Sequence, residues 1–300
     1  MSEFHFHATQ VTRGLPRIEY LQSLELSNSS FVGKKYLIVG ENSPISKSLH
    51  KLIVELGAEV ILGKHSSERI GKDDLRIDVR NVAVLKKASA DLLNANVFLD
   101  GIINCAGVAE TPLDLENVTD YSDFKHVIEV NLIGTYNLFS ILLCNMKNNS
   151  SFIQLAGGGA SGPMMYLPGY SSSKAGVVRL IETLSREFTP SRVRLNCLGP
   201  GAIRSNMTEQ ILQKQLPGKI KREIESTIPG RSGFFDPSLT AKVVCLLLTD
   251  QFSGVSGKFF SAQWDNWEDI NELVKSATSC SDSFSLRRAM CVRIGEQNEQ

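Results

Sequence analysis

The 300-residue sequence predicts an α/β protein of the Rossmann type, with a doubly wound parallel sheet in a single domain. Short apolar runs alternate with amphipathic segments from Lys34 onward, and no repeat or low-complexity linker interrupts them. The apolar runs are continuous, as expected of strands buried on both faces. We therefore divide the chain into an extension at 1–33, a core domain at 34–265 and a C-terminal tail at 266–300.

The predicted elements follow one another in a regular order. The strand at 36–39 ends at Gly40, and the helix at 45–56 places its apolar side chains on one face before Gly57 closes it. The remaining elements are strands at 60–62, 101–103, 152–156, 192–197 and 257–261, and helices at 81–94, 122–147, 170–187 and 237–249. The less regular segment at 203–236 follows a strand end, where α/β proteins place loops that cover substrates.

Composition and charge exclude several classes of protein. The formal net charge is zero, so the chain lacks the basic field of a nucleic-acid binder. No apolar run approaches the ~18 residues of a membrane span, and the N-terminus shows no secretory signal. Six cysteines without C-x-x-C spacing favour a reducing compartment. We therefore expect a cytoplasmic protein with no nucleic-acid or membrane partner and no metal site, His5 and His7 being stray histidines.

Four motifs occur in order along the core domain. They are the turn Val39-Gly-Glu-Asn-Ser-Pro-Ile-Ser46, the tetrapeptide Asn104-Cys-Ala-Gly107, Asn131 with the pair Tyr170 and Lys174, and Pro200-Gly-Ala-Ile-Arg-Ser205. Taken singly, each has an ordinary reading as a strand-end turn or a solvated helix residue. Because of their order, the chain resembles the short-chain dehydrogenase/reductase family over roughly residues 34–262.

The resemblance implies a site for a nicotinamide dinucleotide. The family turn reads T-G-x-x-x-G-I-G; Gly40 and Ile45 match it, whereas Pro44 and Ser46 replace glycines and Pro44 supplies no N–H. Asp78-Val79 matches the pair that borders the adenine. The implied cofactor contacts are Gly40, Ser43, Ile45, Asp78, Val79, Asn104, Ala106, Gly107, Lys174, Pro200, Gly201, Ile203 and Ser205.

The end of the second strand bears on the choice between NAD and NADP. An acidic residue there would bind the ribose 2′-OH and select NAD. This chain has Gly63-Lys64 instead, and a lysine suits a 2′-phosphate. We expect NADP rather than NAD, with a solvated surface lysine as the alternative reading of Lys64.

Tyr170 and Lys174 are four residues apart and therefore share one face of a helix. A phenol has an ordinary pKa of about 10, and a neighbouring ammonium would lower that pKa toward the working range. By resemblance, Tyr170 is the general acid/base, Lys174 tunes it and reaches the cofactor ribose, and Asn131 anchors a relay water.

The family's catalytic serine is absent from this sequence. Its place, thirteen or fourteen residues before the tyrosine, is taken by Gly157 or Ala156. Losing one such hydrogen-bond donor lowers a rate by roughly 10²–10³-fold. Ser161 in the following loop is a candidate substitute donor toward the substrate, or a simple turn former.

Three further stretches resemble a subset of the family linked to polysaccharide and nucleotide-sugar pathways. They are Leu155–Ala160, Ser256–Trp267 and Ser285–Arg288, and in this subset Ala156 is the substituted position. Basic residues within 203–236 suit either a diphosphate or a solvated helix face.

The resemblance implies an NAD(P)-dependent oxidoreductase that interconverts a carbonyl and a hydroxyl on a small molecule by hydride transfer. Sugar-related compounds are candidate substrates, and the missing serine weakens or alters the catalysis. The alternative is a non-catalytic binding or regulatory protein on the same scaffold. The family also pairs as homodimers or homotetramers, here through the helices at 122–147 and 170–187.

Overall fold

The computed structural model describes residues 18–65, 74–112, 121–213, 216–227, 234–279 and 284–285. Seven parallel strands form one sheet in the order β3-β2-β1-β4-β5-β6-β7. Their bounds are β1 Lys35–Val39, β2 Glu59–Lys64, β3 Leu75–Arg76, β4 Leu99–Asn104, β5 Met146–Leu155, β6 Val193–Gly199 and β7 Phe259–Ser261. The predicted fold class is confirmed. The strand order reverses between β1 and β4, which creates the switch point where such sheets bind ligands.

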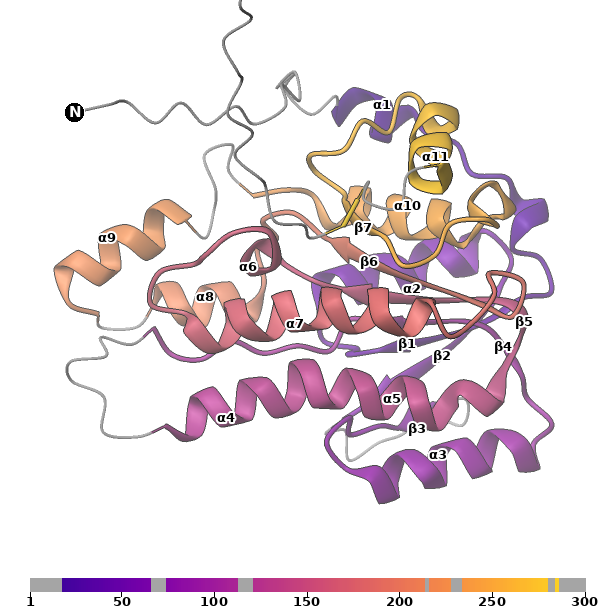
Figure 1. Cartoon of the computed structure of the whole chain (residues 1–300), viewed down its shortest axis with the longest axis horizontal. Coiled ribbons are helices and arrows are strands. Elements are labelled where there is room, and N and C mark those ends of the chain that lie inside the picture. The colour runs from indigo at the N-terminus through magenta and orange to yellow at the C-terminus, as the bar shows by residue number, and fades with distance from the viewer. Residues whose placement is uncertain are drawn as a thin grey trace, which may run out of the picture.

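Helices cover both faces of the sheet (Figure 1). Their bounds are α1 Ile18–Ser23, α2 Pro44–Glu55, α3 Val82–Asn94, α4 Ser122–Ile128, α5 Gly134–Leu142, α6 Gly158–Ser161, α7 Pro168–Ser185, α8 Asn206–Leu212, α9 Gly218–Thr227, α10 Pro237–Leu248 and α11 Ile270–Ser279. One face packs against α2, α10 and α11, and the other against α3, α5 and α7. Each face therefore has its own hydrophobic core.

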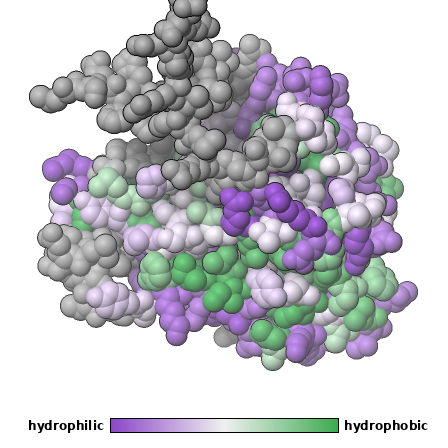
Figure 2. Space-filling view, in the orientation of Figure 1, coloured by the Kyte–Doolittle hydropathy of each residue, from purple (hydrophilic) through white to green (hydrophobic). Residues whose placement is uncertain are grey.

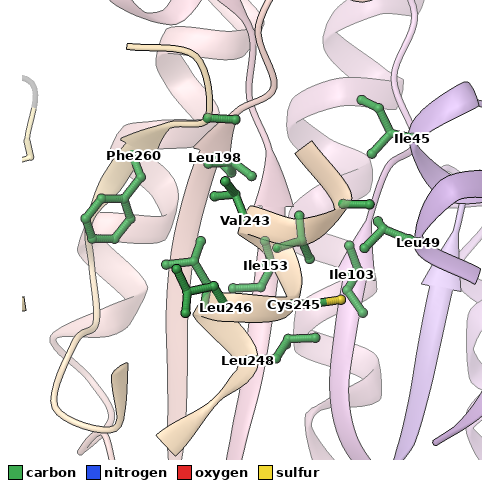
Figure 3. Close-up of a cluster of buried hydrophobic side chains, with 14 of the residues drawn as sticks. Ile45, Leu49, Ile103, Ile153, Leu198, Val243, Cys245, Leu246, Leu248 and Phe260 are labelled. Atoms are coloured by element: carbon green, nitrogen blue, oxygen red, sulfur yellow. The ribbon is translucent and has the colours of Figure 1, made fainter. Parts of the chain in front are cut away.

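Successive strand residues send their side chains to opposite faces, which divides the core in two. In Figure 3, Ile103 and Ile153 of neighbouring strands meet Val243 and Cys245 of α10, and Leu49 of α2 lies beside them. All five side chains have zero exposed area. This packing fixes where the strand ends lie, and the loops that follow those ends build the site.

Three of the predicted helices begin where a side chain accepts a backbone N–H. Ser43 accepts from Ser46 before α2, Asn81 caps α3, and Asp236 accepts from Ser238 before α10. Such N-caps satisfy amide groups that have no partner within the helix. The helices therefore start within one residue of the predicted positions.

The region predicted as one helix at 122–147 is divided in the structure. A π-helical turn, Glu129–Ile133, separates α4 from α5, and β5 already starts at Met146 rather than at the predicted 152. The early part of β5 is exposed and polar at 147–149, so no apolar run marks it. Besides the predicted elements, the described residues contain β3, α1, α6, α8, α9 and α11, which are short or carry little apolar sequence.

Parts of the predicted extension and tail pack onto the core. Leu21 of α1 is 4% exposed, and the Lys242 ammonium donates to the carbonyls of Leu21 and Gln22. Trp267 and Leu273 of the tail are buried in the same core. The packing therefore runs through both predicted domain boundaries. Several residues considered in the sequence analysis lie outside the described residues. They are His5 and His7, the basic residues Lys214 and Arg231 of the 203–236 segment, and most of the 285–288 motif.

One helical stretch, Ser122–Asn145, is long and apolar enough to span a membrane when judged by length and composition alone. In the fold it runs along the sheet beside α3 and α7 (Figure 1). Leu138, Phe139 and Leu142 are buried against the strands, as in the core helix of an α/β domain.

Candidate active site

A cleft of about 1010 Å³ opens at the carboxyl ends of the strands, beside the switch point between the neighbouring strands β1 and β4. Such a position is typical of ligand sites in open α/β sheets. The predicted site residues that line it are Gly40, Ser43, Ile45, Asp78, Val79, Ala106, Gly107, Ser161, Tyr170, Lys174, Pro200, Gly201, Ile203 and Ser205. Lys64, Asn104 and Asn131 are the predicted site residues that lie outside the cleft lining.

The turn after β1 meets the loop after β4 at close range. Gly40 has a φ of +91°, a left-handed conformation that disfavours any side chain. A Cβ added at Gly40 would lie 2.8 Å from the nitrogen of Ala106 and 2.9 Å from the carbonyl carbon of Cys105. Position 40 therefore requires glycine for two separate reasons, and its backbone forms the floor of the cleft.

The substituted turn still presents the N-terminus of α2 to the cleft. Pro44 stands at the first helical position, where a missing N–H has little effect. The Ser46 hydroxyl donates to the carbonyl oxygens of Gly40 and Ser43 at 2.7 and 2.8 Å, and Ser43 accepts from the Ser46 amide. Ser46 thus braces the turn in place of the family glycine, and the Ile45 N–H is the amide left to face a ligand.

Asn104 joins neighbouring strands below the cleft. Its side-chain oxygen accepts from the amide of Ala106, and its Nδ2 donates to Gln154 Oε1 at 2.7 Å. In the loop that follows, a Cβ added at Gly107 would lie 3.1 Å from the Lys174 ammonium nitrogen. Asn104 therefore holds the β4 loop in shape, and Gly107 leaves room for the lysine.

The end of the cleft beside Asp78 holds Arg80 and His65 rather than the predicted Lys64. Lys64 pairs with Asp74 at 2.5 Å, outside the cleft lining. Arg80 and His65 line the cleft instead: Arg80 donates to both carboxylate oxygens of Asp78, at 3.0 and 3.1 Å, and lies 3.2 Å from His65 Nε2. Burial would raise the pKa of Asp78, but the hydrogen bonds and charge of Arg80 lower it below its ordinary value.

Tyr170 lies in the first turn of α7 and faces Gly157. A Cβ added at Gly157 would overlap the phenol oxygen and lie 3.1 Å from the ring carbon that bears it. The side chain of Ala156 packs into the core on the α5 side of the sheet, and Ala156 also lines the cleft. Gly157 is therefore the residue that faces the phenol, and the place of the missing serine at 156 or 157 stays a prediction.

Lys174 lies one helical turn after Tyr170 and is 4% exposed. Its ammonium donates to the carbonyl of Leu155 at 3.1 Å and lies 5.8 Å from the centre of the Tyr170 ring. The two residues thus share the same wall of the cleft, as their spacing predicts, with the ammonium directed at the end of β5.

The ionisation of this pair differs from the sequence-based expectation. Burial, with a smaller contribution from the charge of Glu110, raises the pKa of Tyr170 to about 12. Burial lowers the pKa of Lys174 to about 8. We expected a phenol pKa below its ordinary value; the direction is opposite because burial strips water from the phenolate and the charge of Glu110 opposes a second negative charge. Tyr170 is consequently a protonated donor at neutral pH.

Asn131 lies in the π-helical turn and braces the wall of the cleft. Its side-chain oxygen accepts from the amide of Val108, and its Nδ2 donates to the Val108 carbonyl and to the Ser173 hydroxyl, all at 2.9 Å. π-Helical turns often occur at functional sites. Asn131 therefore connects the β4 loop to α7, and its predicted role with a relay water stays a prediction.

Glu110 is a buried carboxylate that the sequence analysis missed. It is 2% exposed and accepts hydrogen bonds from the backbone amides of Gly169 and Tyr170, the latter at 2.8 Å. Leu167 stands at the N-cap of α7, and its side chain cannot accept a hydrogen bond. These amides therefore need a partner from elsewhere in the chain. In the sequence, a helix start without a capping side chain is the signal that could have pointed to a remote acceptor such as Glu110. Burial raises the pKa of Glu110.

Two of the predicted serines, Ser161 and Ser205, line the cleft with hydroxyls engaged in local hydrogen bonds. Ser161 Oγ donates to the carbonyl of Gly158 at 3.2 Å. Ser205 is the N-cap of α8 and accepts from the amide of Thr208 at 3.3 Å. Each hydroxyl therefore has a structural partner besides any ligand.

The loop after β7 supplies a further side of the cleft that the site prediction omitted. It contributes Gln263, Trp264 and Asp265 to the lining. Gln263 Oε1 accepts from the amide of Ala202, and Asp265 accepts from the amide of Ser261. Burial raises the pKa of Asp265 to about 6. This side is thus more polar than the surroundings of Tyr170.

Comparison with known proteins gives consistent matches. A family model described as Enoyl-(Acyl carrier protein) reductase matches residues 42–262. The 3-oxoacyl-[acyl-carrier-protein] reductase FabG of Thermotoga maritima is 30% identical over 75% of this chain and 94% of its own length. An uncharacterized short-chain type dehydrogenase/reductase, y4mP of Sinorhizobium fredii, is 31% identical over 61% of this chain and 71% of its own.

A solved structure supports the fold independently. The ligand-free aldohexose dehydrogenase AldT of Thermoplasma acidophilum superposes with a TM-score of 0.67, over 79% of this chain and 95% of the other. Its sequence identity is 20%, so the likeness is one of fold. The sheet and its helices are thus shared with a known dehydrogenase.

Proposed function

This chain belongs to the short-chain dehydrogenase/reductase family of oxidoreductases, and we propose that it interconverts a carbonyl and a hydroxyl on a small molecule with NAD(P). The observation that carries the proposal is the position of Tyr170 and Lys174 on one wall of a dinucleotide-sized cleft at the switch point of the sheet. The known activities of its relatives, a reductase among them, support the same reaction class.

The residues of the cleft fit a nicotinamide dinucleotide. Gly40 lines the cleft, and a side chain there would collide with the backbone of the loop after β4, so the turn keeps its backbone open to the cleft. The Ile45 N–H and the N-terminus of α2 suit a pyrophosphate, since a helix start attracts anions. Pro200 and Gly201 line the nicotinamide end implied by the family motif. When bound, the nicotinamide supplies or accepts the hydride.

In the direction of reduction, Tyr170 would donate its proton to the carbonyl oxygen, which becomes the hydroxyl of the alcohol; a bound reduced nicotinamide would supply the hydride to the carbonyl carbon. A pKa of about 12 keeps the phenol protonated at neutral pH, which suits this donation. Lys174 lies beside the phenol and stabilises the phenolate that the proton transfer leaves.

We propose that catalysis is slower than in members of the family that keep the serine. Gly157 has no hydroxyl to donate to the reacting oxygen, which leaves Tyr170, opposite it, as the hydrogen-bond donor. Removing one such donor lowers a rate by about 10²–10³-fold. Ser161 lines the cleft and is the candidate substitute, although its hydroxyl donates to Gly158.

We propose NADP as the preferred cofactor, with its 2′-phosphate bound by Arg80 and His65 rather than by Lys64. Arg80 and His65 line the cleft next to Asp78, whereas Lys64 is paired with Asp74 outside the lining. A guanidinium presents several donors to a phosphate and keeps its charge at any working pH. The 2′-phosphate would therefore be bound by the Arg80 end of the cleft.

We propose that two copies of the chain pair through α4 and α5. Phe124 of α4, Ile133 of the π-helical turn between them and Tyr136 of α5 are 41%, 47% and 50% exposed. Figure 2 shows hydrophobic side chains gathered over the same helices. Apolar patches of this kind mark protein interfaces. Light scattering that gives a monomer at micromolar concentration would overturn this assembly.

We propose a cytoplasmic location, supported by free thiols in the part of the chain that the structure describes. Cys105, Cys144, Cys197 and Cys245 carry no disulfide. Free thiols are typical of reducing compartments.

The test of the proposed function compares Tyr170→Phe with Tyr121→Phe, a control on a tyrosine that is 70% exposed. Oxidation of NADPH and NADH is followed with a panel of aldehydes and ketones. We expect Tyr170→Phe to lose about 10²–10⁴-fold in kcat/KM, while both variants bind cofactor like the wild type. Equal turnover in the two variants would overturn the role of Tyr170. A wild type that binds neither cofactor would favour the non-catalytic alternative.

A further inference from the structure

The cleft beside Tyr170 has an apolar wall built from three separate segments. We call apolar wall the cleft-lining residues Val108, Ala109, Met164, Leu167, Met207 and Ile211. They come from the loop after β4, the loop before α7 and helix α8. Together with Tyr170 they belong to a hydrophobic cluster that is distinct from the two cores of the sheet.

This wall is more than the exposed edge of a core. Val127 and Ile224 fill the interior of the same cluster at 1% exposure. In contrast, Val108, Met164 and Met207 are only partly buried, and they line the cleft. Partly exposed apolar groups that line a cavity are typical of ligand sites, and methionine adapts its shape to varied apolar ligands.

Polar groups next to the apolar wall are already engaged within the protein. Asn131 occupies both the amide and the carbonyl of Val108. The Met164 amide donates to the Ser171 hydroxyl, and the Thr208 hydroxyl donates to the Ser205 carbonyl. A hydroxylated ligand placed here would lose hydrogen bonds to water without replacement, which is unfavourable.

Of the other polar side chains in the lining, Ser161 and Ser205 already form hydrogen bonds with Gly158 and Thr208. His126 and Asn206 are exposed to solvent, so water remains available to them. Gln263 and Asp265 belong to the loop after β7. A polar end of a ligand therefore has a place on the β7 side, whereas the wall around Tyr170 accepts hydrocarbon.

We infer that the substrate carries a hydrocarbon arm beside its reacting carbonyl, and that this arm packs on the apolar wall. The inference rests on the proposed function, because it places the carbonyl at Tyr170. It departs from the sugar-related substrate that the sequence resemblance favoured, since such a substrate would set hydroxyl groups against Met164, Leu167 and Met207.

A chain-length series tests the inference through turnover. Rates with NADPH or NADH are measured for 2-alkanones of increasing length and for ketoses of matching carbon number. Each methylene buried on the wall should raise kcat/KM about fourfold, from the ~0.8 kcal/mol that burial of a CH₂ provides. We expect this rise over the first few carbons and lower values for the ketoses. A flat series, or a preference for ketoses, would overturn the inference while leaving the proposed oxidoreductase function intact.

Matched variants connect the series to the wall. Met207→Gln keeps the side-chain length but places an amide on the wall. In this variant kcat/KM should rise much less with each added methylene than in the wild type. Met165→Gln is the control, because Met165 is 52% exposed and lies outside the cleft lining. It should keep the wild-type slope. An unchanged slope in Met207→Gln, with normal thermal unfolding, would contradict the assignment of the arm to this wall.

A binding measurement separates this inference from the hydride-transfer proposal. Trp264 lines the cleft and is 61% exposed, whereas Trp267, the other tryptophan of the chain, is 3% exposed. Trp264 fluorescence can therefore report ligands with the cofactor present. The concentration of octan-1-ol that gives half of the full change in Trp264 fluorescence should be at least tenfold lower than the corresponding concentration of sorbitol. The opposite order would overturn the inference, whether or not the enzyme turns over any carbonyl.

Discussion

Gly40 gives the sharpest structural prediction, because the chain contains a matched control. Gly40 and Gly33 both adopt left-handed backbone conformations, with φ of +91° and +75°. A Cβ at Gly33 would meet nothing within 4 Å, whereas one at Gly40 would lie 2.8 Å from the Ala106 nitrogen. Gly33→Ala therefore tests the conformational penalty alone, and Gly40→Ala adds a collision with backbone that cannot rotate away.

The expected magnitudes follow from these two terms. Left-handed geometry costs an alanine about 1–2 kcal/mol, and forcing a methyl group into a packed site costs about 1–3 kcal/mol more. We expect Gly33→Ala to lower the free energy of unfolding by about 1–2 kcal/mol and Gly40→Ala by about 2–5 kcal/mol. The lower entropy of the unfolded alanine chain affects both variants alike and cancels in the comparison.

Urea denaturation at equilibrium measures both values, and titration with NADPH measures the consequence for the site. Gly40→Ala should also weaken cofactor binding, since Gly40 lines the cleft and Gly33 does not. Free energies of unfolding that agree within about 0.5 kcal/mol between the two variants would refute the close approach of the β1 turn to the β4 loop.

Three further outcomes are expected. Arg80→Gln should weaken NADPH binding at least tenfold relative to NADH in titration, and Lys64→Gln should leave that ratio unchanged; the reverse pattern would restore Lys64 as the phosphate contact. The pKa of Lys174 falls from 10.5 to about 8 on folding, so the unfolded chain binds more protons between these values and the lysine adds stability as pH rises through them. The unfolding free energy of the wild type minus that of Lys174→Met should therefore increase from pH 8 to 10.5. A constant value would contradict the buried ammonium. Glu110→Gln should lower the unfolding free energy by about 1–3 kcal/mol, since it removes the negative charge and places an NH₂ donor where Oε2 accepts from the Tyr170 N–H; an unchanged urea midpoint would show that these N–H groups need no second carboxylate oxygen.

The sequence predicted the place of the site because parallel strands end at one edge of the sheet. Gly40, Asn104 and Pro200 each follow an apolar run, so alternation alone brings their loops together. Spacing likewise put Tyr170 and Lys174 on one helical face. These inferences needed only the order of elements and the periods of strand and helix.

Side-chain directions and partners could not be obtained in the same way. Lys64 had the right chemistry for a phosphate, but it pairs with Asp74, which approaches it only through the register of β2 and β3. Position 157 rather than 156 faces the phenol because adjacent residues at a strand end point to opposite sides. Glu110 is 59 residues from the amide of Gly169, so no local pattern connects them.

The central claim is that a hydride reaches a carbonyl carbon held beside Tyr170. It is tested most directly with NADPH or NADH deuterated at the transferring C4 position and the carbonyl compound that gives the highest kcat/KM. We predict one deuterium on the carbinol carbon of the alcohol product, detected by mass spectrometry, and a Tyr170→Phe variant that forms this product at least 10²-fold more slowly. An alcohol without deuterium, or equal rates of labelling in wild type and Tyr170→Phe, would contradict the account.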